Sequence, residues 1–133
     1  HAAAYWRDRV KAGEKVAARI INTTSGAGLQ GSIGQSNYVA AKAGIAGLTL
    51  NQAAELARYG VTANCIAPGF FATEMNTALI DNPAFNEWVC QRTPAGRWGQ
   101  PEEMAGTAIF LASSASDFVT GETIRVDGGY AIR

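Results

Sequence analysis

The segment "GVTANCIAPG", residues 60–69, decides the fold class of this chain. Its central run, Val61–Ala67, is mostly apolar and has the length typical of a strand buried on both faces of a sheet. Gly60 precedes the run as a helix stop, and Pro68 with Gly69 ends it, because proline has no N–H group to donate to a ladder. We therefore expect a short parallel strand over 61–67.

The segments before this strand predict that it completes a strand–helix–strand unit. Residues Ser36–Tyr59 contain no proline and many alanines and leucines, which predicts one long helix that ends at Gly60. Upstream, Val16–Thr24 is apolar and β-branched over the length of a strand, and a Gly/Ser/Gln loop separates it from the helix. Two strands joined through a helix in this way pair in parallel.

The rest of the chain continues the alternation of helices and strands. The other expected elements are, in chain order, an amphipathic helix over Ala2–Lys11, an irregular segment with one or two short helices over Phe70–Gly99, a helix over Pro101–Ala112, and a strand over Glu122–Val126 that ends at Asp127–Gly129. This order predicts an α/β fold with a doubly wound parallel sheet, and one domain over residues 1–133. We expect the segment 70–99 to cover a substrate.

The composition fits one globular domain and argues against two classes of partner. The chain has 133 residues, of which 47% are hydrophobic and 17% charged, so it can bury a core. Its 11 basic and 11 acidic residues give zero net charge without a basic cluster, which argues against nucleic-acid binding. No apolar run approaches the roughly 18 residues that span a bilayer, and no leader precedes the first strand. We therefore expect no membrane partner and a cytoplasmic location.

The two cysteines, Cys65 and Cys90, lie in apolar surroundings and lack the CxxC spacing of zinc and redox sites. His1 is the only histidine that could join them at a metal ion. We expect two buried free thiols and no metal site.

The glycine run Gly26-Ala-Gly28-Leu-Gln-Gly31 has the GxGxxG spacing of a dinucleotide fingerprint, but its context does not fit. In that fingerprint the third glycine opens a helix, and an acidic residue about 20 positions later binds the ribose. Here the predicted helix begins only near Ser36, and the first downstream carboxylate is Glu55, inside that helix. We interpret residues 26–35 as a loop.

Three polar residues that follow the predicted strand Val16–Thr24 are candidates for one active site. Tyr38 and Lys42 are four positions apart on the predicted helix, so their side chains project from the same face. Ser25 follows the carboxyl end of the preceding strand, which is where open α/β sheets bind ligands. We expect all three side chains to meet in one crevice.

Their chemistry is complementary. A lysine ammonium at about 4 Å in an effective dielectric near 20 favours a phenolate by about 4 kcal/mol, which lowers a tyrosine pKa by roughly three units. Tyr38 would then exchange a proton near neutral pH, and Ser25 could hydrogen-bond the substrate oxygen. The alternative is a chance YxxxK match in which Tyr38 is an ordinary helix-packing residue.

In combination these residues resemble the motifs of the short-chain dehydrogenase/reductase family. The resemblance depends on the spacing Ser25-x12-Tyr38-x3-Lys42, on "NYVAAKAG" at 37–44, on "NCIAPGFFAT" at 64–73 and on "VDGG" at 126–129. It implies a Rossmann-like fold and an enzyme that interconverts a small-molecule carbonyl and a secondary alcohol with NAD or NADP. It also implies a homo-oligomer, commonly a tetramer, with interfaces on the helix of Tyr38 and on the final strand.

The resemblance further implies a role for each matching residue. Tyr38 would be the general acid/base, Lys42 would bind the nicotinamide ribose and tune Tyr38, and Ser25 would orient the substrate oxygen. Other residues would surround the two ligands: Pro68, Gly69, the backbone of Phe71 and Thr73 at the nicotinamide, and Gly26, Ala27, Gln35 and Phe70 at the substrate.

Some family motifs have no counterpart in this sequence. The glycine-rich first turn, the residue that selects NAD or NADP, the Asn-Ala-Gly segment and a catalytic asparagine would all lie before His1. We therefore expect the C-terminal catalytic half of one Rossmann-like domain, which associates or aggregates when it is alone. Residues 20–67 resemble acyl-chain and hydroxysteroid dehydrogenase-type members, whereas 70–129 look more like gluconate 5-dehydrogenase and 3-oxoacyl-carrier-protein reductase.

Two other functions are weighed against this interpretation. One is a truncated, catalytically incompetent fragment that acts only as an interaction or assembly module. The other is serine hydrolysis through Ser25, which has little support because there is no GxSxG motif and the only histidine is His1.

Overall fold

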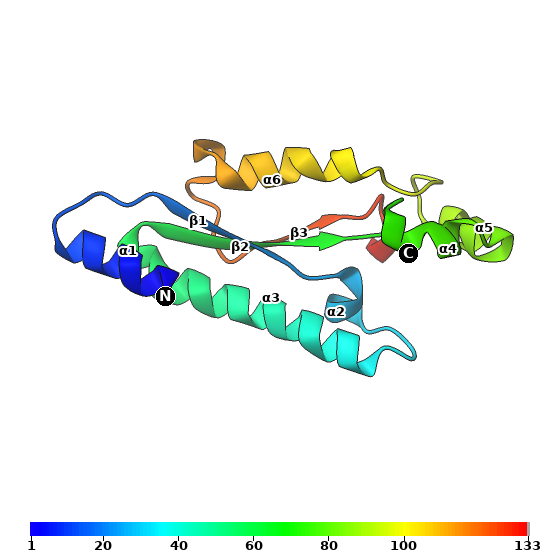
Figure 1. Ribbon diagram of the computed structural model, residues 1–133, viewed down its shortest axis with the longest axis horizontal. Helices are drawn as coiled ribbons and strands as arrows, with labels where there is room; N and C mark the ends of the chain where they lie inside the picture. The colour runs from blue at the N-terminus through cyan, green and yellow to red at the C-terminus, as the bar shows by residue number, and fades with distance from the viewer. Residues whose placement is uncertain (133) are drawn as a thin grey trace.

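A parallel sheet forms the middle layer of the computed structural model, which describes residues 1–132 (Figure 1). Within those residues the 3-stranded sheet has the order β1-β2-β3, with β1 (Ala18–Thr23), β2 (Val61–Pro68) and β3 (Thr123–Val126). Thr23 of β1 pairs with Ile66 of β2, and Pro68 of β2 pairs with Val126 of β3. The predicted parallel α/β sheet is confirmed.

Helices cover both faces of the sheet. The helical elements are, in chain order, α1 (Ala2–Lys11), α2 (Gly26–Gln30), α3 (Ser36–Leu56), the 3₁₀ turns η1 (Ala57–Tyr59) and η2 (Glu74–Asn76), α4 (Thr77–Ile80), α5 (Pro83–Arg92), the 3₁₀ turn η3 (Pro101–Met104), α6 (Ala105–Ala112), and the 3₁₀ turns η4 (Ser114–Ser116) and η5 (Tyr130–Ile132). α3 runs along one face and α6 along the other, whereas α4 and α5 lie beyond the carboxyl ends of β2 and β3 (Figure 1). No helix within 1–132 is both long enough and apolar enough to cross a membrane.

The long helix ends close to where the sequence predicts. α3 stops at Leu56, and η1 carries the chain on to Tyr59 in a tighter helical turn. Gly60 then adopts a φ of 71°, in the left-handed region that other residues rarely enter. The predicted glycine stop is therefore confirmed.

The loop predicted after the first strand is wrong for residues 26–30, which form the short helix α2. Ser25 lies in an extended conformation at its N-terminus, and its hydroxyl accepts a hydrogen bond from the backbone N–H of Ala27 at 3.3 Å. This is the usual capping role of serine, which stabilises the first turn of a helix. Gly31 ends the helix with a φ of 85°.

The core lies on both faces of β2, the central strand. Val61, Ala63 and Cys65 of β2 are at most 2% exposed, and Leu111 of α6 packs with no exposed surface. The helix α3 contributes buried residues from the opposite layer. Cys65 is the buried free thiol that was expected, but Cys90, also free, is only half-buried because it lies on α5 at the rim of the fold.

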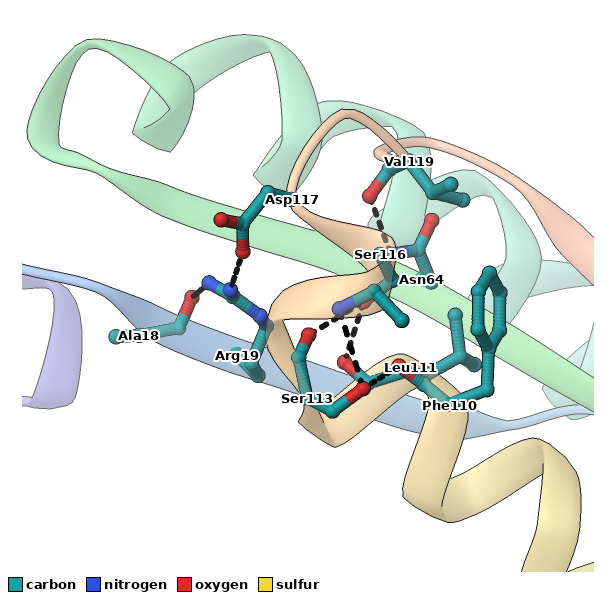
Figure 2. A network of polar contacts seen from close by, with 10 residues as sticks. Ala18, Arg19, Asn64, Phe110, Leu111, Ser113, Ser116, Asp117 and Val119 are labelled. Carbon is teal, nitrogen blue, oxygen red and sulfur yellow. Dashed lines mark hydrogen bonds and ion pairs between the residues drawn. The ribbon is translucent and has the colours of Figure 1, made fainter.

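A polar network holds the turn after α6 against β1 (Figure 2). Ser116 is fully buried, and its hydroxyl is within hydrogen-bonding distance of the backbone carbonyls of Leu111 at 3.0 Å and Ser113 at 3.1 Å. The next residue, Asp117, forms an ion pair with Arg19 of β1. These contacts close the amino-terminal edge of the sheet, opposite the edge at which the candidate residues lie.

Asn64 ties the segment before β3 to the centre of the sheet. Its side chain is 1% exposed, donates to the carbonyl of Val119 at 2.8 Å and accepts from the N–H of Glu122 at 3.0 Å. Figure 2 shows the first of these bonds. A buried amide with both ends satisfied fixes where β3 begins.

Candidate functional site

The carboxyl ends of the strands meet at one edge of the sheet. Beyond β1, the N–H of Thr24 donates to the carbonyl of Ile66 at 2.9 Å, so Ser25 follows directly beside the end of β2. Beyond β2, the N–H of Gly69 donates to the carbonyl of Val126 at 2.9 Å, at the end of β3. Parallel pairing therefore brings together loops that are far apart in sequence.

Ser25 and the start of α2 occupy the β1 side of this edge. The Ser25 hydroxyl accepts the bond from Ala27 described above, and its own hydrogen can still be donated to another oxygen. Gly26 and Ala27 form the first turn of α2, and both are half-buried. Ser25 thus has two local functions, capping a helix and presenting a donor at the strand end.

Tyr38 and Lys42 lie one helical turn apart on α3. The Tyr38 side chain is 42% exposed, and the Lys42 amine lies 5.7 Å from the centre of its ring. The same amine donates to the carbonyl of Thr23, the last residue of β1, at 3.1 Å. Lys42 thereby joins the helix that carries Tyr38 to the strand end that precedes Ser25.

Thr24, which the sequence analysis did not single out, strengthens this junction. It is 2% exposed, and its hydroxyl donates to the backbone carbonyl of Lys42 at 2.6 Å. Lys42 therefore contacts both residues that precede Ser25, Thr23 through its amine and Thr24 through its carbonyl. A β-branched polar residue at a buried strand end was the only sequence signal for this contact.

Gly69 forms the turn after β2, close to the turn after β3. A β carbon at Gly69 would lie 2.7 Å from the Cα of Asp127, so no larger residue fits without displacing that backbone. Pro68 precedes it as the last residue of β2. The strand therefore ends in a compact proline ring followed by a residue without a side chain.

Phe71 is held at the end of β2 by backbone contacts. Its ring is 9% exposed, and it forms an isolated parallel bridge with Gly99. Its carbonyl accepts from the Asn76 side chain at 2.8 Å and from the N–H of Thr73 at 3.0 Å. Asn76 is thus a second residue that the sequence analysis missed, because its partner is a backbone atom.

Phe70 lies at the centre of an aromatic cluster formed with Phe85, Trp88, Trp98 and Tyr130. Its ring contacts each of the other four edge-on, with ring centroids between 5.2 and 6.0 Å apart. The cluster joins the end of β2 to α5 and η5. The predicted irregular segment 70–99 therefore packs as an ordered cover beside the strand ends.

Gln35 and Thr73 are two further residues of the predicted site. Both are exposed and lie at the N-termini of α3 and η2, and neither side chain caps its helix. No ligand contact of either residue follows from this geometry, and their roles stay predictions.

A cavity of about 100 Å³ lies between the turns after β2 and β3. Phe70, Phe71 and Asp127 contribute to its lining, but Ser25, Tyr38 and Lys42 do not. We therefore place the candidate site beside α3, at the side chains of Ser25, Tyr38 and Lys42, and not in this cavity.

Arg97 and Glu103, which also line that cavity, form a two-point ion pair. Both guanidinium–carboxylate contacts measure 2.7 Å, and Glu103 also accepts from the N–H of Gln100 at 2.7 Å. The bonds from Arg97, and then that from Gln100, lower the pKa of Glu103 to about 2. Within residues 1–132 no group of three His, Cys, Asp or Glu side chains could hold a metal ion.

Known proteins resemble the chain over nearly its whole length. The family model described as "Enoyl-(Acyl carrier protein) reductase" matches residues 2–131. The 5-keto-D-gluconate 5-reductase of Escherichia coli (strain K12) is 45% identical over 122 residues, which are 90% of this chain and 47% of that protein. The 3-oxoacyl-[acyl-carrier-protein] reductase of Synechocystis sp. is 53% identical over 112 residues, 84% of this chain and 43% of that protein.

A solved structure has the same fold. The gluconate 5-dehydrogenase from Burkholderia cenocepacia J2315, in complex with NADP and tartrate, matches with a TM-score of 0.86 at 47% sequence identity. The match covers 96% of this chain and 49% of that one. The chain spans about half the length of the curated relatives it matches.

Proposed function

This chain belongs to the short-chain dehydrogenase/reductase family, and on that premise we propose that it acts in an NAD- or NADP-dependent oxidoreductase. The proposed reaction interconverts a carbonyl and a secondary alcohol. The observation that carries the proposal is the arrangement of Tyr38 and Lys42, with an exposed phenol ring beside an amine that is held at the end of β1.

Each residue of this arrangement has a separate task in the proposed reaction. In reduction, Tyr38 donates its phenolic proton to the substrate oxygen, forming the O–H bond, and in oxidation it takes that proton back. The Lys42 ammonium favours the phenolate that remains, because opposite charges attract. Ser25 donates a hydrogen bond to the same oxygen and orients the carbonyl. The nicotinamide, when bound, supplies or accepts the hydride at the carbonyl carbon.

The residues at the strand ends fit a nicotinamide riboside. An amine and a phenol suit ribose hydroxyls, and Pro68 and Gly69, at the end of β2, would border the nicotinamide ring. The backbone of Phe71 and the side chain of Thr73 would complete this side. Support for the cofactor comes from the gluconate 5-dehydrogenase structure, which was solved in complex with NADP.

The names of the relatives suggest two substrate classes, keto derivatives of sugar acids and 3-oxoacyl thioesters. Gly26, Ala27, Gln35 and Phe70 would face the substrate. A small panel of 5-keto-D-gluconate and 3-oxoacyl thioesters, each offered with NADH and with NADPH, distinguishes the classes and the cofactor.

The test measures loss of nicotinamide absorbance with the chain and with the longest polypeptide that its gene encodes. Replacement of Tyr38 by Phe removes one oxygen atom and is expected to lower turnover by about 10²- to 10⁴-fold, the range of general acid–base catalysis. Lys42→Met is expected to weaken cofactor binding and turnover together. Turnover by Tyr38→Phe equal to that of the unsubstituted protein would remove Tyr38 from its role.

A second candidate is an assembly module that binds no dinucleotide. It is favoured by exposed apolar side chains on the helices and loops. Leu50 of α3 is 60% exposed, Ile109 of α6 66% and Phe118 fully exposed. A homo-oligomer seen by sedimentation, with no heat of NADPH binding, would favour the module. Micromolar NADPH binding by the chain would contradict it.

A further inference from the structure

We propose that Gly28 is a positioning residue, whose backbone contact with Lys42 sets the spacing between the Ser25 hydroxyl and the Tyr38–Lys42 pair. This inference rests on the proposed function. It gives a role to Gly28, the middle glycine of the GxGxxG run, which is not a dinucleotide fingerprint here. Gly28 itself contacts neither substrate nor cofactor in the proposed reaction.

The backbones of α2 and α3 come close together at Gly28. A β carbon built there would lie 2.7 Å from the carbonyl carbon and from the Cβ of Lys42, and 2.8 Å from the backbone nitrogen of Ala43. These atoms belong to the backbone or lie next to it, so they cannot rotate away. Any residue larger than glycine must therefore push α2 and α3 apart.

The three glycines of the run have different surroundings. A β carbon at Gly26 would meet nothing within 4 Å, and Gly31 has a positive φ of 85° but no close neighbour. Only Gly28 combines a φ outside the left-handed region with a close backbone contact. Its lack of a side chain is therefore required by packing between two helices, not by a turn.

A displacement at Gly28 passes directly to Ser25, because both residues belong to the same turn. The N–H of Gly28 donates to the carbonyl of Ser25 at 3.0 Å, and the Ser25 hydroxyl caps α2. Lys42 also contacts the two residues before Ser25. The backbone carbonyl of Lys42 accepts a hydrogen bond from the Thr24 hydroxyl, and the Lys42 amine donates one to the Thr23 carbonyl. Lys42 thus contacts the chain before and after Ser25.

Lys42 is therefore both the residue that α2 contacts at Gly28 and the proposed partner of Tyr38. Because Tyr38 lies one turn before Lys42 on the same helix, the separation between Ser25 and Tyr38 depends on how closely α2 approaches Lys42. A change of about 1 Å in such a separation can lower turnover by about 10²-fold.

A double-mutant cycle tests the inference. Gly28→Ala is expected to lower turnover by about 10²-fold, with much less change in NADPH affinity, because the short helix α2 is expected to move away from the long helix α3, which carries Lys42. In a Ser25→Ala background the same substitution is expected to have a much smaller effect, because Ser25 is the group through which it acts. Gly106→Ala, at an open position in α6, is the matched control and is expected to change neither quantity. Equal losses in both backgrounds would overturn the inference.

A structural readout separates this inference from the proposed function. In Gly28→Ala the bond between the Thr24 hydroxyl and the Lys42 carbonyl, 2.6 Å here, is expected to lengthen or break, and the Gly31 amide is expected to exchange faster. A crystal structure of the variant with that bond unchanged would overturn the inference, whatever the activity. A Ser25→Ala protein as active as the original would instead refute the proposed role of Ser25.

If Gly28→Ala does not fold, Thr24→Val loosens the same junction with almost no change of volume. It removes the hydroxyl that binds the Lys42 carbonyl, whereas Thr24→Ser keeps it. We expect Thr24→Val, but not Thr24→Ser, to lower turnover. In a Ser25→Ala background, the loss of turnover caused by Thr24→Val is expected to be smaller. A loss that is the same for Val and Ser, or independent of Ser25, would count against it.

Discussion

Replacement of Asn64 by Ala tests how far the buried amide at the centre of the sheet stabilises the fold. The substitution removes the donor to the Val119 carbonyl and the acceptor for the Glu122 N–H. Because Asn64 is 1% exposed, water cannot easily take its place, and two backbone groups lose their partner. Each such group costs about 1–3 kcal/mol when it is left unpaired in the interior.

We expect Asn64→Ala to lower the free energy of unfolding by about 3 kcal/mol, near the lower end of the sum of two such costs, since the loop 119–122 can relax toward solvent. With an m-value of about 2 kcal/mol/M in urea, the midpoint of denaturation moves down by about 1.5 M. Fluorescence of the tryptophans, followed in urea at neutral pH, measures this shift.

Asn51→Ala serves as the control, because Asn51 is an exposed residue on α3. Its effect is expected to stay within about 0.5 kcal/mol. A loss below about 1 kcal/mol for Asn64→Ala would refute the reasoning, because it would mean that Val119 and Glu122 find other partners without cost.

Two further predictions concern an ion pair and the core. Glu103→Gln removes the partner of Arg97. The pKa of Glu103 is lowered from 4.5 to about 2, so the ion pair stabilises the fold above about pH 4.5. This contribution to stability disappears as the pH falls through 2. Acid titrations of unfolding should therefore show a flatter stability profile between these pH values for the variant, and identical slopes would contradict the assignment. Leu111→Ala, at a side chain with no exposed surface, is expected to cost about 2–5 kcal/mol by urea denaturation, whereas Ile109→Ala, 66% exposed on the same helix, should cost under about 1 kcal/mol. Similar losses for the two would mean that α6 does not pack on the sheet as described.

The order of elements was predictable from local signals. The alternation of apolar runs with a long alanine-rich segment predicted β1, α3 and β2, and Gly60 ends the helix as expected because its backbone takes a left-handed conformation. The spacing of Tyr38 and Lys42 also predicted two side chains on one face. These features depend on residues close together in sequence, which is why periodicity reveals them.

The glycine run shows where such reasoning ends. It was interpreted as a loop, yet residues 26–30 form α2, because the Ser25 hydroxyl caps a turn that is too short to show a helical period. The need for glycine at Gly28 depends on Lys42, which is distant in sequence but touches it in the fold. No pattern within the run distinguishes Gly28 from its neighbours.

The sequence by itself therefore determined the family, the parallel strand–helix–strand order and the residue types that carry the proposed chemistry, because each is written in local spacing. Only the tertiary structure decided which atoms approach one another: the Thr24 hydroxyl and Gly28 against Lys42, Gly69 against Asp127, and the Phe70 ring within the aromatic cluster. The physical reason is that close packing acts between segments brought together by folding, and the distance between them is a property of the whole sheet and its helices.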